Sequence, residues 1–563
     1  MESSRRRFLG TSHTDSGAIV DEMKSYSKVP VQNDGINEYG NIRIKPISSG
    51  PFQTSDEIEL PLTSTNFDVM EFSNTYIHLK ARIALRCSNP PVVEGSDDFA
   101  KMLGENQYLF LGFKASPHII RDYQFKFNGT PISTTMQSRA ITESFLYSTF
   151  KSKSEMANKK YVFSPYAEVS QLDNSLCGLY IPIKDLKSEA VYKTVDVIIP
   201  LKELLCMEDF NEFPNSIFGE LRIIFHVSSE AFVYTEVNPV SSIRKGIISG
   251  KIDKTVPHLS EVLGVDADSF DFQHSFEQIG IGSAVQYISG YDSSTNKLTY
   301  STASSFVPFI DSIEIRDAWV DARGYRMDTT ALRSLVSHFS SQPFTVCAQK
   351  VEVNQFPSGP EASGLRTSMN VKFNHCTDIE ILHPTDSRQR TVFRNIQYDN
   401  YQIQIGNRRF PEQFVGTQSA EFHEQQIQST DFDSIFEAND EYEHSLTDAR
   451  IEEKADGTVQ ILKPTTDNTS FVPIFQLERS GSGTELWFDG IDSPNEKVEL
   501  TGKPQFQGRA DVYYKDANTP SPILCCCGEA YWIFRLINSE PRCQFVAAHS
   551  YEEGYNNPDI EAV

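Results

Sequence analysis

The chain has little tryptophan, scattered cysteines and no long apolar run. Its 563 residues include 3 Trp and 9 Cys, and the cysteines follow neither the spacing of a disulfide framework nor that of a paired CxxC zinc site. No stretch approaches the about 18 apolar residues that a membrane-spanning helix needs. The N-terminus has basic residues, but the apolar segment of a signal peptide does not follow them. We therefore expect a protein that is made in the cytosol, keeps its thiols reduced and has no membrane span.

Positive charge is also scarce. The net charge is −25, whereas a general phosphate-binding surface needs clustered lysines and arginines. We therefore expect no specific nucleic-acid recognition, and any contact of that kind would have to be local. Arg5, Arg6 and Arg7 form the only charge cluster of the N-terminal region. They either touch nucleic acid or an anionic inner surface, or belong to a solvated terminus.

Complete catalytic and metal-binding motifs are absent too. The run GIISGK at 246–251 has too few residues between its glycines for a phosphate-binding loop, and no hydroxyl follows its lysine. The run HEQQI at 423–427 lacks the second histidine of a zinc-protease helix. The adjacent Cys525, Cys526 and Cys527 cannot all face one side of a strand, so we interpret them as buried thiols. The sequence thus predicts no catalytic residue, no cofactor and no metal.

The chain does contain alternating apolar and polar residues, which are typical of half-buried strands. In YIHLKARIAL at 76–85, apolar residues alternate with His78, Lys80 and Arg82. Together with many turn signals, such runs favour an all-β protein built of sandwiches, barrels or jelly rolls. Similar alternation recurs at 221–227, 313–315, 344–348, 369–373 and 532–536.

Helices are few and short. Four apolar residues of TTALRSLVSHFSS at 329–341 follow the spacing of one buried helical face, with Asp328 or Thr329 as the cap. A second helix is predicted within 136–150. Short helices inserted between strands are consistent with a β scaffold.

Composition divides the chain into an arm, two strand-rich units, a connection and a tail. The first residues are polar and lack periodicity, as expected of an extended arm. Turn-forming residues separate the two strand-rich units. The predicted parts are an N-terminal arm at 1–57, a first β unit at 58–235, a connection with a long loop at 236–305, a second β unit at 306–548 and a C-terminal tail at 549–563.

The stretch 383–413 holds five arginines around a strand pattern in which Tyr401, Ile403 and Ile405 alternate with glutamines. Guanidinium groups bind carboxylates and backbone carbonyls in a two-pronged geometry, which suits ties between loops or between subunits. The alternative is that they are solvated charges at strand ends. The predicted ties are Arg388, Arg390, Arg394, Arg408 and Arg409.

Residues 369–413 resemble the core of the second half of major capsid proteins of Polinton-like, adintovirus-like and virophage-like DNA viruses. The matching runs are HPTDSRQRTVFRN at 383–395 and DNYQIQIGNRRFP at 399–411. Weaker similarity extends to FVPIFQLERS at 471–480 and VELTGKP at 498–504, and 196–227 looks like the late strands of the first jelly roll of such a protein.

This resemblance implies an all-β fold of two consecutive jelly-roll β-sandwiches, with a few short inserted helices and an extended N-terminal arm. It implies a homotrimer of pseudo-hexagonal outline, and trimers that contact one another in an icosahedral shell together with vertex (penton) and minor capsid proteins. The arm would lie at the capsid base, and the long loops would form outer towers. The expected location is the virion capsid, after synthesis in the host-cell cytoplasm.

Two other classes of protein are weighed against this one. A soluble β-sandwich binding module, such as a carbohydrate-binding or adhesin-like protein, would use aromatic platforms, and the scarcity of tryptophan and the lack of a signal peptide oppose it. A cupin-like enzyme would need histidine and carboxylate ligands grouped on paired strands. The 12 histidines are scattered instead.

Overall fold

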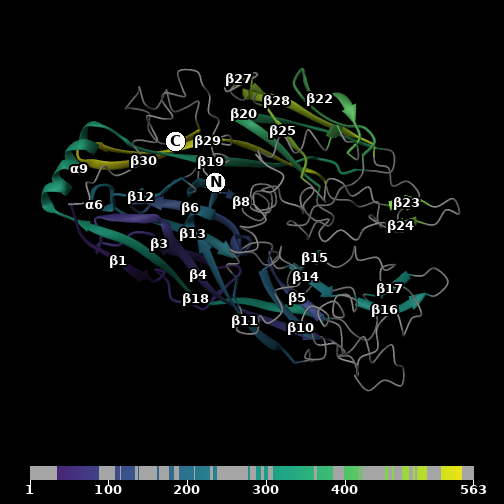
Figure 1. Cartoon of the computed structure of the whole chain (residues 1–563), viewed down its shortest axis with the longest axis horizontal. Coiled ribbons are helices and arrows are strands. Elements are labelled where there is room, and N and C mark those ends of the chain that lie inside the picture. Colours follow the sequence, from purple (N-terminus) through teal and green to yellow (C-terminus); the bar gives the residue numbers. More distant parts are fainter. Residues whose placement is uncertain are drawn as a thin grey trace.

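The chain folds into two strand-rich units that pack side by side in a computed structural model (Figure 1). No helix in the described part of the chain has the length and apolar character to cross a membrane. Arg5, Arg6, Arg7, most of the connection at 236–305 and the tail at 549–563 lie outside the described residues. The structure describes residues 35–87, 108–113, 116–132, 137–138, 162–163, 177–182, 189–207, 209–227, 233–237, 277–278, 287–292, 297–301, 308–360, 364–383, 398–417, 419, 421–422, 451–453, 459–461, 472–477, 479–480, 486–488, 491–503 and 521–547.

The first sheet of the first unit is built around the long strand β4 (Val69–Cys87), whose predicted alternation is confirmed. Ile77, Leu79, Ala81 and Ile83 are fully buried, while the alternate residues His78, Lys80 and Arg82 point to the other face. The sheet has the order β1-β18-β4-β11-β9, with β2 beside β18 and β12 beside β4. The bounds of these strands are β1 Ile36–Ile44, β2 Phe52–Gln53, β9 Val162–Phe163, β11 Val191–Pro200, β12 Glu212–Phe213 and β18 Pro308–Met327.

The second sheet of this unit has the order β3-β13-β6-β7, with β8 beside β6. The longer strands of these two sheets alternate between them along the chain, in the order β1, β3, β4, β6, β11, β13 and β18, and in the first sheet the last of these, β18, lies between β1 and β4. This strand order is that of a jelly roll. The bounds are β3 Glu57–Pro61, β6 Ile120–Phe127, β7 Thr130–Pro131, β8 Gln137–Ser138 and β13 Leu221–Val227.

Two predicted boundaries shift because strand pairing overrides local pattern. We predicted an arm up to residue 57, but β1 pairs with β18 along its whole length. Most side chains of β1 are exposed, so this edge strand carries little apolar periodicity. We assigned 306–327 to the second unit, yet β18 pairs with β4 and β1. The first unit therefore ends after β18, and Gln137–Ser138, which we expected in a helix, form β8.

The large sheet of the second unit repeats the arrangement of the first. Its order is β19-β29-β20-β28-β21-β22, with β25 beside β20 and β30 beside β29. The last long strand, β29, again lies next to the first strand of its unit, β19, so the all-β double jelly-roll fold is confirmed. The bounds are β19 Phe344–Gln355, β20 Leu365–Leu382, β21 Tyr401–Ile405, β22 Arg408–Val415, β25 Ile474–Gln476, β28 Ile491–Gly502, β29 Ile523–Ile537 and β30 Glu540–Ala547.

Most of the smaller sheets lie in the right-hand half of Figure 1, while β27 lies at the top near the middle. One has the order β10-β5-β14-β15, and three are two-stranded. The bounds are β5 Tyr108–Phe113, β10 Cys177–Pro182, β14 Val233–Val237, β15 Glu277–Gln278, β16 Tyr287–Asp292, β17 Lys297–Ser301, β23 Ile451–Glu453, β24 Val459–Ile461, β26 Arg479–Ser480 and β27 Leu486–Phe488.

The helix α9 (Thr329–Ser341) joins the two units, and the spacing of its apolar residues predicts this helix. Asp328 caps it by accepting a hydrogen bond from the backbone N–H of Thr330, and Leu335 and Phe339 are buried. Of the four apolar residues that we expected on its buried face, Val336 is 40% exposed. The remaining described helices are single turns: η2 Ser116–Ile119, η5 Leu201–Glu203, η6 Leu205–Met207 and α6 Asn215–Phe218.

One aromatic core spans both units. The segment between β11 and β13 contributes Phe210 and Phe213, whose rings lie 5.8 Å and 5.1 Å from the ring of Phe534 on β29. Trp532 on the same strand lies 5.4 Å from Phe125 on β6 and donates a hydrogen bond from Nε1 to the Cys206 carbonyl at 2.6 Å. The units therefore share buried apolar surface, so their relative position is fixed by packing.

We expect Gly219→Ala to destabilise the protein by about 1–3 kcal/mol. Gly219 has φ +102, and a Cβ there would lie 2.3 Å from the Asn128 Oδ1. That oxygen accepts the Glu220 N–H at 2.7 Å. A shift of the Asn128 side chain would therefore break this hydrogen bond, which links the β6–β7 turn to the start of β13. Gly129→Ala is the matched control, because its φ is +83 but its Cβ would meet nothing within 4 Å. If urea denaturation shows that Gly219→Ala and Gly129→Ala lower the free energy of unfolding equally, the predicted clash with Asn128 is wrong.

Candidate assembly site

The structure places only part of the predicted arginine cluster. Arg388, Arg390 and Arg394 lie outside the described residues. Arg408 and Arg409 begin β22, and both side chains are exposed. Their position at a strand start beside a turn agrees with the sequence pattern, while their role in ties or subunit contacts stays a prediction.

The two described arginines belong to a hairpin of β21 and β22. Gly406, with φ +55, provides the left-handed turn, and the pairs Ile405–Arg408 and Ile403–Phe410 follow it. Tyr401, Ile403 and Ile405 are buried on β21. The hairpin therefore presents its second strand outward from a well-packed first strand.

A bulge interrupts this hairpin after Phe410. Ile403 pairs with Phe410 and Tyr401 pairs with Val415, so the single residue Gln402 faces the four residues 411–414. The buried Gln402 amide donates to the carbonyls of Pro411 at 2.8 Å and Glu412 at 3.2 Å. These bonds hold the backbone of the bulge, and Phe414 is 53% exposed. Sequence reasoning missed this feature, although a proline inside a strand pattern is a signal for a bulge.

A buried aromatic cluster flanks the undescribed segment 384–397. His383 precedes the segment and Tyr398 follows it, and the His383 Nε2 lies 3.0 Å from the Tyr401 hydroxyl. The Tyr398 and Tyr401 rings are 5.1 Å apart. Burial lowers the pKa of His383 to about 3, and burial raises the pKa of Tyr401 well above its ordinary value. His383 is therefore neutral at physiological pH.

Backbone bonds fix the far side of the same cluster. Thr417 accepts the Tyr398 N–H on its Oγ1 at 2.8 Å and donates its own N–H to the Tyr398 carbonyl at 2.8 Å. A Cβ on Gly502 would lie 2.6 Å from the Tyr398 ring, so β28 approaches this ring closely. The residues on either side of 384–397 are thus rigidly held.

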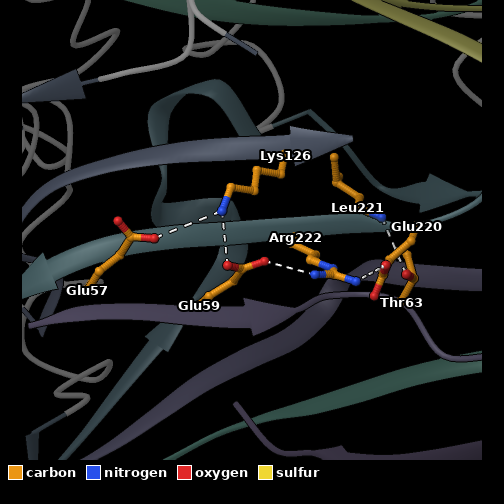
Figure 2. A network of polar contacts seen from close by, with 7 residues as sticks. All are labelled: Glu57, Glu59, Thr63, Lys126, Glu220, Leu221 and Arg222. Carbon is orange, nitrogen blue, oxygen red and sulfur yellow. Dashed lines mark hydrogen bonds and ion pairs between the residues drawn. The ribbon is translucent and has the colours of Figure 1, made fainter. Parts of the chain in front are cut away.

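The second sheet of the first unit carries a charged network on its polar face (Figure 2). The Glu59 carboxylate binds the Lys126 Nζ at 3.0 Å and the Arg222 Nη1 at 2.9 Å, and Arg222 also binds Glu220. Glu57 lies 3.9 Å from Lys126. Burial raises the pKa of Glu59, but the bonds from Arg222 and Lys126 outweigh it and hold the pKa below its ordinary value. The network cross-links β3, β6 and β13, and sequence reasoning missed it because the three strands are distant in the chain.

The first sheet carries a second cluster on its polar face, centred on Trp319. The ring stacks on His78 at 5.0 Å, and the Arg43 guanidinium lies 4.5 Å from its centre. Asp321 binds the His78 Nε2 at 2.8 Å and accepts the Trp319 Nε1–H at 3.2 Å. Trp319 is only 8% exposed as a result. Burial lowers the pKa of His78, and Asp321 opposes part of that shift.

The described side chains include buried thiols but no metal-ligand set. No group of three or more His, Cys, Asp or Glu in this part of the chain is placed to hold a metal ion. Cys525, Cys526 and Cys527 are buried free thiols, as we interpreted them. Cys527 donates to the buried Glu380 carboxylate at 2.8 Å.

Comparison with solved structures finds matches of low sequence identity that cover most of the chain. No protein-family model matches the chain, and no curated protein sequence does. The mavirus major capsid protein is 12% identical, with 92% of this chain and 91% of that chain covered and a TM-score of 0.42. A chain of the Sputnik virophage structure is 10% identical, with 95% and 94% covered and a TM-score of 0.43. The Faustovirus major capsid protein is 9% identical, with 90% and 92% covered and a TM-score of 0.40.

Proposed function

We propose that this chain is a major capsid protein, which forms homotrimeric capsomers of pseudo-hexagonal outline that build an icosahedral shell. The observation that carries this proposal is the repeated strand order. The first unit has β1-β18-β4-β11 and the second has β19-β29-β20-β28, so one chain holds two jelly rolls. This double jelly roll is the fold that the resemblance of residues 369–413 to such capsid proteins implies.

The shared aromatic core supports a structural role. Phe210 and Phe213 of the first unit pack on Phe534 of the second, so the two jelly rolls form one rigid block. A rigid block with two similar halves suits a trimer whose outline is nearly six-sided, because three copies present six jelly rolls. The fold alone does not fix function, so assembly has to be measured directly.

The remaining roles follow from this proposal. The protein acts without catalysis or cofactor, contacts neighbouring trimers, vertex proteins and minor capsid proteins, and resides in the virion capsid after synthesis in the host cytoplasm. Arg5, Arg6 and Arg7 would face the inner surface. The predicted loop ties or subunit contacts are Arg388, Arg390, Arg394, Arg408 and Arg409.

We expect the purified chain to form trimers. Size-exclusion chromatography with light scattering would give a mass near three times 63.6 kDa, and negative-stain imaging would show nearly hexagonal particles or shells. A protein that stays strictly monomeric at high concentration would overturn the proposal. It would instead favour a soluble β-sandwich binding module.

A further inference from the structure

We propose that the bulge 411–414 is a preformed knob by which one copy of this chain grips a second copy, with Phe414 as the anchor. The inference deepens the proposed function and rests on it, because it names the residues that make a contact between copies. It draws on the position of the bulge, its rigidity, its exposed ring and the charge beside it.

The bulge lies at an outer edge of the large sheet. β22 is the last strand in the order β19-β29-β20-β28-β21-β22, and within the described part of the chain its only strand partner is β21. Glu412, Gln413 and Phe414 are all exposed. The edge is therefore open to another molecule.

The backbone of this edge does not suit the addition of a regular strand by a neighbour. Pro411 has no N–H to donate, and a bulge breaks the even spacing that strand pairing requires. A neighbouring molecule would therefore contact the β22 edge through side chains. Phe414 is the largest apolar group that this edge exposes.

The bulge is held rigidly from within. The Gln402 amide binds the carbonyls of Pro411 and Glu412, and Val415 is buried directly after the exposed ring. The exposure of Phe414 therefore follows from a fixed backbone. An ordered exposed aromatic ring loses little conformational entropy on binding and buries a large apolar area, which is the character of an interface anchor.

Charge favours another copy of this chain as the partner. Arg408 and Arg409 are exposed on the strand that carries the bulge. The chain has a net charge of −25, so the surface of a second copy attracts these cations. A closed ring of copies needs an interface in which the knob of one copy meets a different surface of the next.

The first experiment replaces Phe414 with serine and measures self-association by light scattering over a range of concentrations. We expect the dissociation constant for self-association to rise at least about tenfold. Gln413→Ala is the matched control, because it changes the neighbouring exposed residue of the same bulge and leaves the ring in place. Its dissociation constant should equal that of the wild type, and both variants should give the wild-type circular dichroism spectrum because the replaced side chains are exposed.

A second experiment identifies what the ring touches. A photo-crosslinking phenylalanine at position 414 of the full chain should give a covalent dimer of this chain on irradiation. If trimers form but Phe414→Ser assembles like the wild type and no crosslinked dimer appears, the knob is wrong and the proposed function stands. If the wild type is strictly monomeric, the knob and the proposed function are both wrong. A crosslink only to added nucleic acid or to another protein would likewise overturn the second copy as partner.

Discussion

Trp532→Ala is expected to lower the free energy of unfolding by about 3–5 kcal/mol, the range for removing a fully buried large aromatic side chain. Trp532 is 0% exposed, and its ring lies 4.9 Å from Phe545 and 5.4 Å from Phe125. Phe125 belongs to the first unit and Phe545 to the second. The cavity would therefore open in the core that both units share.

The same substitution also removes a hydrogen bond. The Trp532 Nε1–H donates to the Cys206 carbonyl at 2.6 Å in the buried interior. Trp532→Phe keeps most of the ring contact and loses this bond, so we expect it to cost about 1–3 kcal/mol. Urea denaturation followed by circular dichroism measures both values. A loss below about 1 kcal/mol for the alanine variant would show that the two units do not depend on this contact.

Acid is expected to destabilise the second unit through His383. The pKa of this buried histidine is lowered from 6.5 to about 3, so the unfolded chain binds its proton at a higher pH than the folded chain does. The folded state has its full stability with respect to His383 above pH 6.5, where this histidine is neutral in both states. That stability is lost as the pH falls from 6.5 toward 3. The loss is about 1.4 kcal/mol for each pH unit in this window.

His383→Gln provides the comparison, because glutamine can still bond with the Tyr401 hydroxyl and carries no titrating group. Between pH 7 and pH 4.5, we expect the unfolding free energy of the wild type to fall by about 2–3 kcal/mol more than that of the variant. Urea denaturation at several pH values measures this slope. Parallel curves for the two proteins would show that His383 is accessible to protons in the folded state.

The sequence predicted those parts of the fold that local pattern determines. Alternation located β4 and β13, and the apolar spacing located α9 with Asp328 as its cap. The sequence did not predict which strands pair with each other. β18 pairs with β4 across more than two hundred residues, and periodicity carries no information about pairing partners. The edge strand β1 was missed since its side chains are mostly exposed.

The candidate assembly site was predicted in composition but not in geometry. The strand pattern of Tyr401, Ile403 and Ile405 follows from the sequence, while the role of the exposed Arg408 and Arg409 stays a prediction. The bulge does not, because it depends on how Gln402 reaches the carbonyls of Pro411 and Glu412. The buried state of His383 depends likewise on rings that other segments supply.

The return of β18 to the middle of the first sheet constrains how the protein can fold during translation. β4 lacks one of its two long neighbours until β18 has left the ribosome, long after β13 has been made. At about 5–20 residues per second, synthesis of the segment 228–307 between β13 and β18 takes about 4–16 seconds. During that time the apolar face and unpaired edge of β4 are open to wrong partners. We expect the nascent chain to need chaperone protection in this interval, and a chain truncated before β18 to aggregate.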